Sequence, residues 1–134
     1  MKKDIENRTD IDRLVQLFYN KITNNSEISD FFGKVVPIDW EKHLPIMSGF
    51  WDFILFSTPN AYLGNVMNPH FHVNALKKIE PKHFEIWLNL FNQSVDELFE
   101  GTKAEDAKNA AFNIGSTLKY KLKKENEQPI ERKQ

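Results

Sequence analysis

The chain has 134 residues, a formal charge of −1, 40% hydrophobic residues and no cysteine. This length suits one domain with a substantial core, and the near-neutral charge argues against a broad surface for nucleic acid or an anionic membrane. The lack of cysteine excludes disulfides, thiolate metal ligands and a cysteine nucleophile.

The first predicted helix begins at Thr9, which has capping-box spacing to Asp12. Its apolar residues recur at helical spacing, namely Ile11, Leu14, Val15, Phe18 and Ile22. We expect this helix to end near Asn24. A short helical turn over residues 26–32 follows, closed by Gly33.

Asp39 is the predicted cap of a second long helix. Its expected apolar side consists of Trp40, His43, Leu44, Met47, Phe50, Trp51, Ile54 and Leu55. Because Pro45 has no N–H to donate to the Glu41 carbonyl, the first turn should be irregular or the helix should begin nearer Lys42. Residues 57–68 show no periodicity and predict an ordered loop of functional significance.

Asn68 and Pro69 predict the cap and first residue of a short helix that ends before Pro81. Pro81 can itself begin the third long helix, for which Gly101 is the expected stop. The apolar side of this third helix consists of Phe84, Trp87, Leu88, Phe91, Val95, Leu98 and Phe99.

A second capping box, Thr102 with Glu105, predicts the start of the last helix. Beyond Leu122 the run KKENEQPIERKQ has mixed charge, a proline and no apolar face. We therefore predict one domain over residues 1–123 and a disordered tail over residues 124–134. The opening MKKDIENRTD has no apolar run behind its lysines, so we expect a soluble, cytoplasmic protein without a membrane segment.

No common enzyme motif accompanies the four histidines, and the H-x-H pair of His70 and His72 is by itself a weak metal signal. More unusual are Tyr19, His43 and Trp87, whose polar tips lie among apolar residues on three separate predicted helices. Each alone is best explained by an apolar body in the core with its polar tip near the surface. Together in a dry cavity, they would offer hydrogen bonds to a small, electron-rich ligand.

Six segments of the chain resemble the truncated haemoglobins, and specifically their third group. They are LVQLFYNKI, ISDFFGKVV, DWEKHLPIMSGFW, GNVMNPH, KHFEIWLNLFNQSVDELF and AEDAKNAAFNIG, which span about residues 11–115. The closely placed glycine pairs associated with the other two groups are not found here. The resemblance implies an all-α truncated globin fold, a two-over-two helical sandwich around a haem.

The resemblance also implies the roles of individual residues. Tyr19 of the FY pair, His43 of the W-x-x-H motif and Trp87 of F-x-x-W would be distal residues, and His70 would be the proximal ligand of the haem iron. The slot for haem b (iron protoporphyrin IX), held non-covalently because the chain has no cysteine, would be lined by Phe32, Met47, Phe50, Tyr62 and Met67. The sequence does not single out the partners of the haem propionates, for which Lys42, Tyr62, His72 and Lys77 are all candidates.

One departure from the family pattern concerns the loop before the proximal histidine. Many relatives have proline directly before the Met or Leu of this loop, where this chain has Val66, and its own proline is Pro69. The difference would shift the loop and tilt the imidazole without changing the histidine spacing. His70 is therefore the predicted iron ligand, with His72 as the second choice.

The expected ligand is a diatomic gas, O2, CO or NO, at a five-coordinate ferrous iron. Three distal donors would slow O2 release, since each hydrogen bond contributes about 1–3 kcal/mol. This tenacity suits scavenging, sensing or redox chemistry better than bulk oxygen delivery. The sequence assigns no catalytic residue and no redox partner, and we expect a monomer.

Two other readings of the sequence remain open. In a bis-histidine electron-transfer protein, His43 would be the sixth iron ligand opposite His70, which would leave Tyr19 and Trp87 without a role. In a haem-free helical interaction module, side chains or another ligand would fill the apolar slot.

Overall fold

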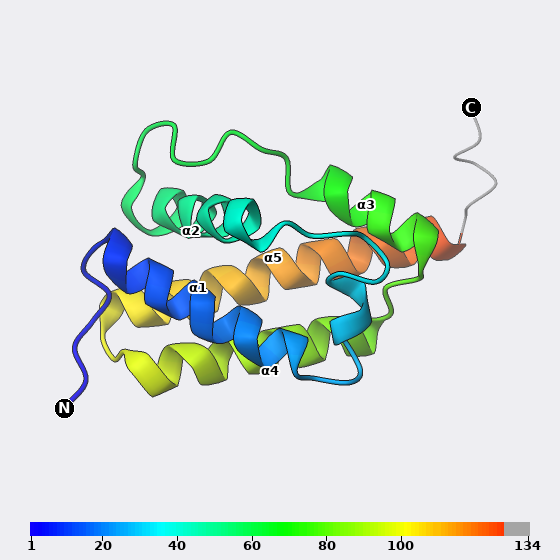
Figure 1. Ribbon diagram of the computed structural model, residues 1–134. Helices are drawn as coiled ribbons and strands as arrows, with labels where there is room; N and C mark the ends of the chain where they lie inside the picture. The colour runs from blue at the N-terminus through cyan, green and yellow to red at the C-terminus, as the bar shows by residue number, and fades with distance from the viewer. Residues whose placement is uncertain (128–134) are drawn as a thin grey trace.

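The computed structural model describes residues 1–127, and this part of the chain is all helical, with no strand. The predicted all-α class is thus confirmed. None of the helices in residues 1–127 combines the length and hydropathy needed to cross a membrane. In chain order (Figure 1) the elements are α1 (Arg8–Thr23), the 3-10 turn η1 (Ser29–Phe31), α2 (Trp40–Phe56), α3 (Met67–Leu76), α4 (Pro81–Leu98) and α5 (Thr102–Glu127).

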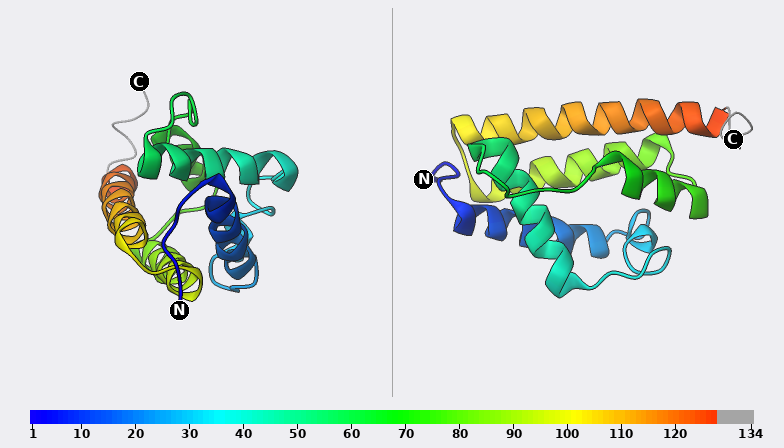
Figure 2. Two further views of the ribbon diagram at one scale, coloured as in Figure 1. Left: turned by 90° about the vertical axis from the view of Figure 1, so that its left-hand side faces the viewer. Right: turned by 90° about the horizontal axis from the view of Figure 1, so that it is seen from above.

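The four long helices form two packed pairs. α1 packs on α2 and α4 on α5, while further contacts join α1 to α4 and α2 to α5. In the end-on view of Figure 2 these four helices surround a common centre, and in the view from above α2 crosses over α1. The short helix α3 packs on α5. This is the two-over-two arrangement that the sequence predicts.

The core lies at the centre of the four helices. All five apolar residues predicted to face inward from α1 are buried, at 2% exposure or less. They meet Phe91 and Val95 of α4, both with no exposed surface, and the small residues Ala107 and Ala111 of α5. A second, smaller cluster of Phe84, Leu118 and Leu122 lies beside α3. Small side chains on α5 allow the helices to approach closely.

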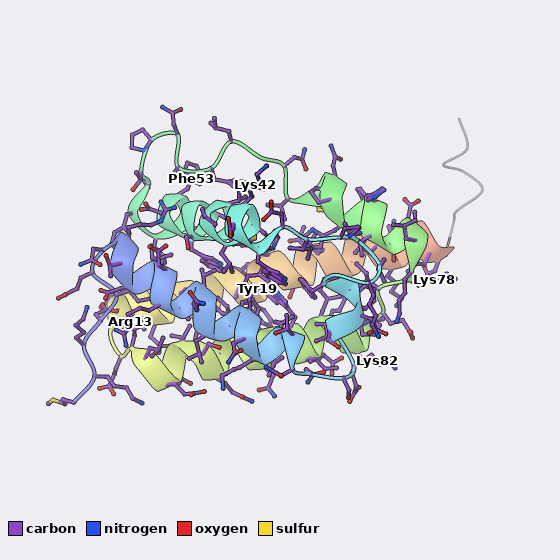
Figure 3. The ribbon with its side chains drawn as sticks, in the orientation of Figure 1. Arg13, Tyr19, Lys42, Phe53, Lys78 and Lys82 are labelled. Carbon is purple, nitrogen blue, oxygen red and sulfur yellow. The ribbon has the colours of Figure 1, made fainter. Side chains whose placement is uncertain are left out.

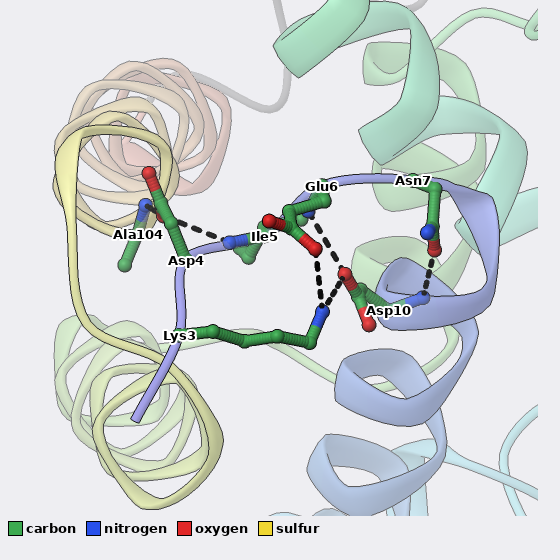
Figure 4. A network of polar contacts seen from close by, with 7 residues as sticks. All are labelled: Lys3, Asp4, Ile5, Glu6, Asn7, Asp10 and Ala104. Carbon is green, nitrogen blue, oxygen red and sulfur yellow. Dashed lines mark hydrogen bonds and ion pairs between the residues drawn. The ribbon is translucent and has the colours of Figure 1, made fainter. Parts of the chain in front are cut away.

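Two helix starts differ from the predicted capping boxes. The cap of α1 is Asn7, whose side chain accepts a hydrogen bond from the Asp10 N–H, so the predicted Thr9 start is wrong. At α5 the cap is supplied by Asp4, whose carboxylate accepts hydrogen bonds from the N–H groups of Lys103 and Ala104, both at 2.9 Å. Figure 4 shows Asp4 beside Ala104. The N-terminal segment therefore takes the place predicted for Thr102.

Asp39 caps α2 as predicted, with Oδ1 accepting from the Glu41 N–H. Pro45 does not move the start of α2 toward Lys42, which was one of the two expected effects, since α2 begins at Trp40 and contains Pro45. The carbonyl that loses its donor belongs to Glu41, in an exposed first turn where water can replace the missing hydrogen bond.

The loop between α2 and α3 is packed against α2. A Cβ atom at Gly49 would collide with the Ala61 carbonyl oxygen, so only glycine allows this close approach. Asp52 accepts a hydrogen bond from the Thr58 hydroxyl at 2.7 Å and pairs with the Arg8 guanidinium at 3.2 Å. These contacts hold the loop residue Tyr62 over α2, where its ring lies 5.1 Å from that of Phe50.

α3 begins two residues before the position predicted from Asn68 and Pro69. The reason is Asn65, whose side-chain oxygen accepts from the N–H groups of Met67 and Asn68 at 2.9 and 3.1 Å. The start of α4 at Pro81 is confirmed. Its last residue is Leu98, three residues before the predicted stop at Gly101.

The last helix is longer than predicted. It continues to Glu127, so residues 124–127, which were expected to belong to a disordered tail, are helical. Asn126 accepts a hydrogen bond from the Asn74 side chain at 2.9 Å, which ties this final turn to α3. The rest of the predicted tail, residues 128–134, lies outside the described residues.

Candidate functional site

His70 lies in the first turn of α3, and a hydrogen bond to the residue that precedes this helix fixes its ring. Its Nδ1 atom lies 2.7 Å from the Val66 carbonyl oxygen. Because a carbonyl can only accept, Nδ1 carries the proton and Nε2 keeps its lone pair. Burial lowers the pKa of His70 and outweighs the opposing effect of this hydrogen bond. The imidazole is therefore neutral at pH 7, the form that coordinates metals.

His72, the second choice as iron ligand, is exposed, whereas His70 is half-buried. The two residues are two positions apart on one helix and so point in different directions. The described contacts give His72 no carbonyl partner that would fix its ring.

Three aromatic rings gather where α1 meets the start of α2. The His43 ring lies 5.4 Å from the Tyr19 ring and 5.4 Å from the Trp40 ring, edge to face in both cases. The Tyr19 and Trp40 rings are 5.6 Å apart, which closes the triangle. Phe32 adds a fourth ring, 5.8 Å from Tyr19. Figure 3 shows Tyr19 near the middle of the bundle.

The polar groups of this cluster are neutral at pH 7. Burial raises the pKa of the Tyr19 phenol well above its ordinary value and lowers the pKa of His43. Within residues 1–127, the buried Nε2 atom of His43 has no hydrogen-bond partner. An unsatisfied buried polar atom is unfavourable by about 1–3 kcal/mol, so its presence here points to a ligand.

Trp87 of α4 joins the ring cluster through Phe18. The Phe18 ring is 5.0 Å from Tyr19 and 5.8 Å from Trp87. Gly115 of α5 provides room for the indole, whose nearest atom would be 3.5 Å from a Cβ atom placed there. The three predicted distal residues thus belong to one aromatic network, with Tyr19 and His43 in direct contact.

The predicted lining residues are all half-buried apolar or aromatic side chains. Phe32, Met47 and Phe50 pack against the main core, and Tyr62 packs on Phe50. Met67 packs against the second cluster instead. Each keeps apolar surface that a flat, apolar cofactor would cover.

The sequence predictions assign no role to two residues that the structure places at this site. One is Val66, whose carbonyl fixes the His70 ring. In the sequence, Val66 stands out only as a departure from the family pattern. The other is Trp40, which contacts both Tyr19 and His43. The W-x-x-H motif already indicated that Trp40 lies beside His43, since residues three apart share one side of a helix.

Two open grooves run beside α1, and neither is lined by a predicted site residue. One lies between α1 and Leu98, and the other between α1 and Pro45. Charged side chains such as Arg13 and Arg8 contribute to their walls. The ring cluster and His70 therefore both lie outside these surface grooves.

Comparison with known proteins agrees with this fold. No protein-family model matches the chain. The group 3 truncated hemoglobin ctb of Campylobacter jejuni is 26% identical over 102 residues, which cover 74% of this chain and 77% of that protein. The crystal structure of a group III truncated hemoglobin from Campylobacter jejuni superposes with a TM-score of 0.78, covering 91% of this chain and 95% of that one at 24% identity.

The fold is therefore that of a truncated globin. Within this class, the predicted resemblance to the group III truncated haemoglobins is confirmed by the sequence match.

Proposed function

We propose that this protein binds haem b non-covalently, with His70 as the proximal ligand of the iron, and binds a diatomic gas beside Tyr19, His43 and Trp87. The ferrous iron of haem supplies an open axial position at which O2, CO or NO binds. The observation that carries the proposal is the hydrogen bond from His70 Nδ1 to the Val66 carbonyl, which directs a neutral Nε2 lone pair away from its own helix.

The unpartnered Nε2 atom of His43 supports the gas-binding side of the proposal. Tyr19 stays protonated across the physiological range, because burial raises its pKa, and it can therefore donate a hydrogen bond. The raised Tyr19 pKa and lowered His43 pKa keep both side chains uncharged, so they stabilise a gas ligand that gains partial negative charge without creating a buried ion pair.

The surroundings also fit the cofactor. Half-buried apolar side chains from α2, from α3 and from Phe32, directly after η1, would cover the faces of the porphyrin, and the candidate propionate partners lie at the exposed or half-exposed surface. Lys77, one of these partners, already lies 3.9 Å from the Asp30 carboxylate. The lack of cysteine leaves coordination by His70 and apolar burial as the means of holding haem.

Several neutral donors would hold a gas ligand tenaciously. We therefore assign the protein to ligand scavenging, sensing or redox chemistry rather than bulk oxygen delivery. It acts in this proposal as a cytoplasmic monomer that binds neither nucleic acid nor membranes.

The decisive experiment is the absorption spectrum of the purified ferrous protein with and without CO. We expect a Soret band that shifts on CO addition in the wild type, and loss of this coordination in His70→Ala. His72→Ala is the matched control and should behave as the wild type. Normal haemin uptake combined with unchanged iron coordination in His70→Ala would refute the proposal.

The same spectra separate the rival functions. A six-coordinate low-spin ferrous spectrum before gas is added, lost in His43→Leu, would favour the bis-histidine electron-transfer protein. No Soret band after saturation with haemin would favour the haem-free interaction module.

A further inference from the structure

Trp40 is the first residue of α2 and directly follows the capping residue Asp39. Its side chain is half-buried, and it packs on the rings of Tyr19 and His43. The proposed function uses both of these neighbours as donors to the gas ligand and assigns nothing to Trp40 itself. Through these two contacts the indole can act on both proposed donors.

The His43 imidazole lies between two other rings. The interplanar angles are 86° to Trp40 and 81° to Tyr19, so each contact is edge to face, the arrangement that aromatic rings favour. Tyr19 comes from α1 and Trp40 from the same helix as His43, three residues earlier. The imidazole is thus held by one ring from a neighbouring helix and by one ring from its own.

The two ring contacts of His43, with Trp40 and with Tyr19, are called the clamp below. They are needed because the buried position by itself is unfavourable for the His43 imidazole. Its Nε2 atom has no partner among the described residues, whereas a rotamer that pointed into water would satisfy it. His43 lies in the first turn of α2, which is partly exposed, so solvent is within reach. Packing against Trp40 and Tyr19 offsets the missing hydrogen bond.

We propose that Trp40 is a positioning residue, which holds the His43 imidazole inside the distal cluster so that Nε2 is ready to donate to a gas ligand. This inference rests on the proposed function for its purpose, but the clamp itself is a property of the protein without cofactor. It can therefore be tested in both forms.

The first test uses the haem-free protein and NMR titration of the His43 ring, assigned with a His43→Gln variant. In the wild type and in Trp40→Phe, which keeps a ring, the pKa of His43 should lie below its ordinary value. In Trp40→Leu, which keeps apolar volume but no ring, the pKa should rise toward that of an exposed histidine. An unchanged His43 pKa in Trp40→Leu would overturn the proposal.

The second test uses the haem-loaded protein and the rate of O2 dissociation. Loss of one hydrogen bond to the ligand speeds release by about tenfold. We expect this increase in His43→Leu and in Trp40→Leu, no further increase in the double variant, and an undiminished effect of Trp40→Leu on a Tyr19→Phe background. An effect of Trp40→Leu that persists without His43 would show that Trp40 does not act through His43.

The two tests separate failure of the inference from failure of the proposed function. If the wild type takes up no haem, the proposed function fails, and the titration still decides whether Trp40 holds His43. A helical circular-dichroism spectrum establishes that Trp40→Leu folds. If Trp40→Leu does not fold, nuclear Overhauser effects between the His43 and Trp40 rings of the wild type test whether Trp40 holds His43. Their absence would overturn the proposal.

Discussion

Replacing Asp4 by alanine should destabilise the protein strongly, although this residue lies outside every helix. The Asp4 carboxylate accepts hydrogen bonds from the N–H groups of Lys103 and Ala104, in the first turn of α5, and one from Ile5. Ala104 is 1% exposed, so water cannot easily replace the lost acceptor. Loss of an N-cap is unfavourable by about 0.5–2 kcal/mol, and a charged cap that accepts from several backbone donors belongs at the upper end.

We therefore expect the free energy of unfolding to fall by about 2 kcal/mol at pH 7, and the Tm by about 8 °C for a domain of this size. Asp4→Asn keeps one acceptor oxygen and should lose about half as much. Asp12→Ala is the matched control, because the ion pair of Asp12 with Arg8 is exposed and should contribute less than about 0.5 kcal/mol.

The effect should depend on pH in a defined direction. Desolvation alone would raise the pKa of Asp4, but the three backbone donors and Lys103 outweigh it, so the pKa lies below its ordinary value. The stabilisation is complete above the unfolded pKa of about 3.9 and is lost as the pH falls through the lower folded value. Urea unfolding from pH 7 to pH 2.5 tests this. A difference between wild type and Asp4→Ala below about 0.5 kcal/mol at pH 7, or one independent of pH, would refute the reasoning.

Two other predictions concern the distal donors and a buried histidine. Tyr19→Phe and Trp87→Phe should each speed O2 dissociation from the haem-loaded protein by about tenfold in stopped-flow measurements, and unchanged rates would remove the role assigned to these donors. Burial lowers the pKa of His83, whose Nδ1 accepts from the Glu80 N–H, so its contribution to stability is complete above pH 6.5 and lost as the pH falls toward the lower folded pKa. His83→Gln, which can accept the same hydrogen bond but does not titrate, should lose less stability than the wild type between pH 7 and pH 5, and equal losses would contradict this.

The predictions that succeeded were those carried by residues close together in sequence. The apolar spacing of α1, the Asp39 cap and the start at Pro81 all depend on a few neighbouring side chains. The cap of α5 failed because its acceptor, Asp4, lies 99 residues before Lys103. A local pattern such as Thr102 with Glu105 cannot reveal a competitor that comes from the other end of the chain.

The same distinction applies to the candidate site. Helical spacing placed Tyr19, His43 and Trp87 on separate helices with polar tips, and the structure joins them in one aromatic network. The tether of His70 to Val66 spans four residues and follows the ordinary helical repeat. The triangle with Trp40 could not be predicted, because it depends on how α2 crosses α1, which tertiary packing sets.

The anchoring of α3 has a consequence for how stability is distributed over the molecule. Asn74 is the buried residue of this helix, and α5 is its main neighbour. Because its apolar side chains Met67, Phe71 and Val73 are only partly buried, α3 should open locally at a smaller free energy than α1 or α4, and its amide protons should exchange sooner. A cofactor held by His70 would add its binding free energy to this helix first, so occupancy could be followed by the slowing of exchange in residues 67–76.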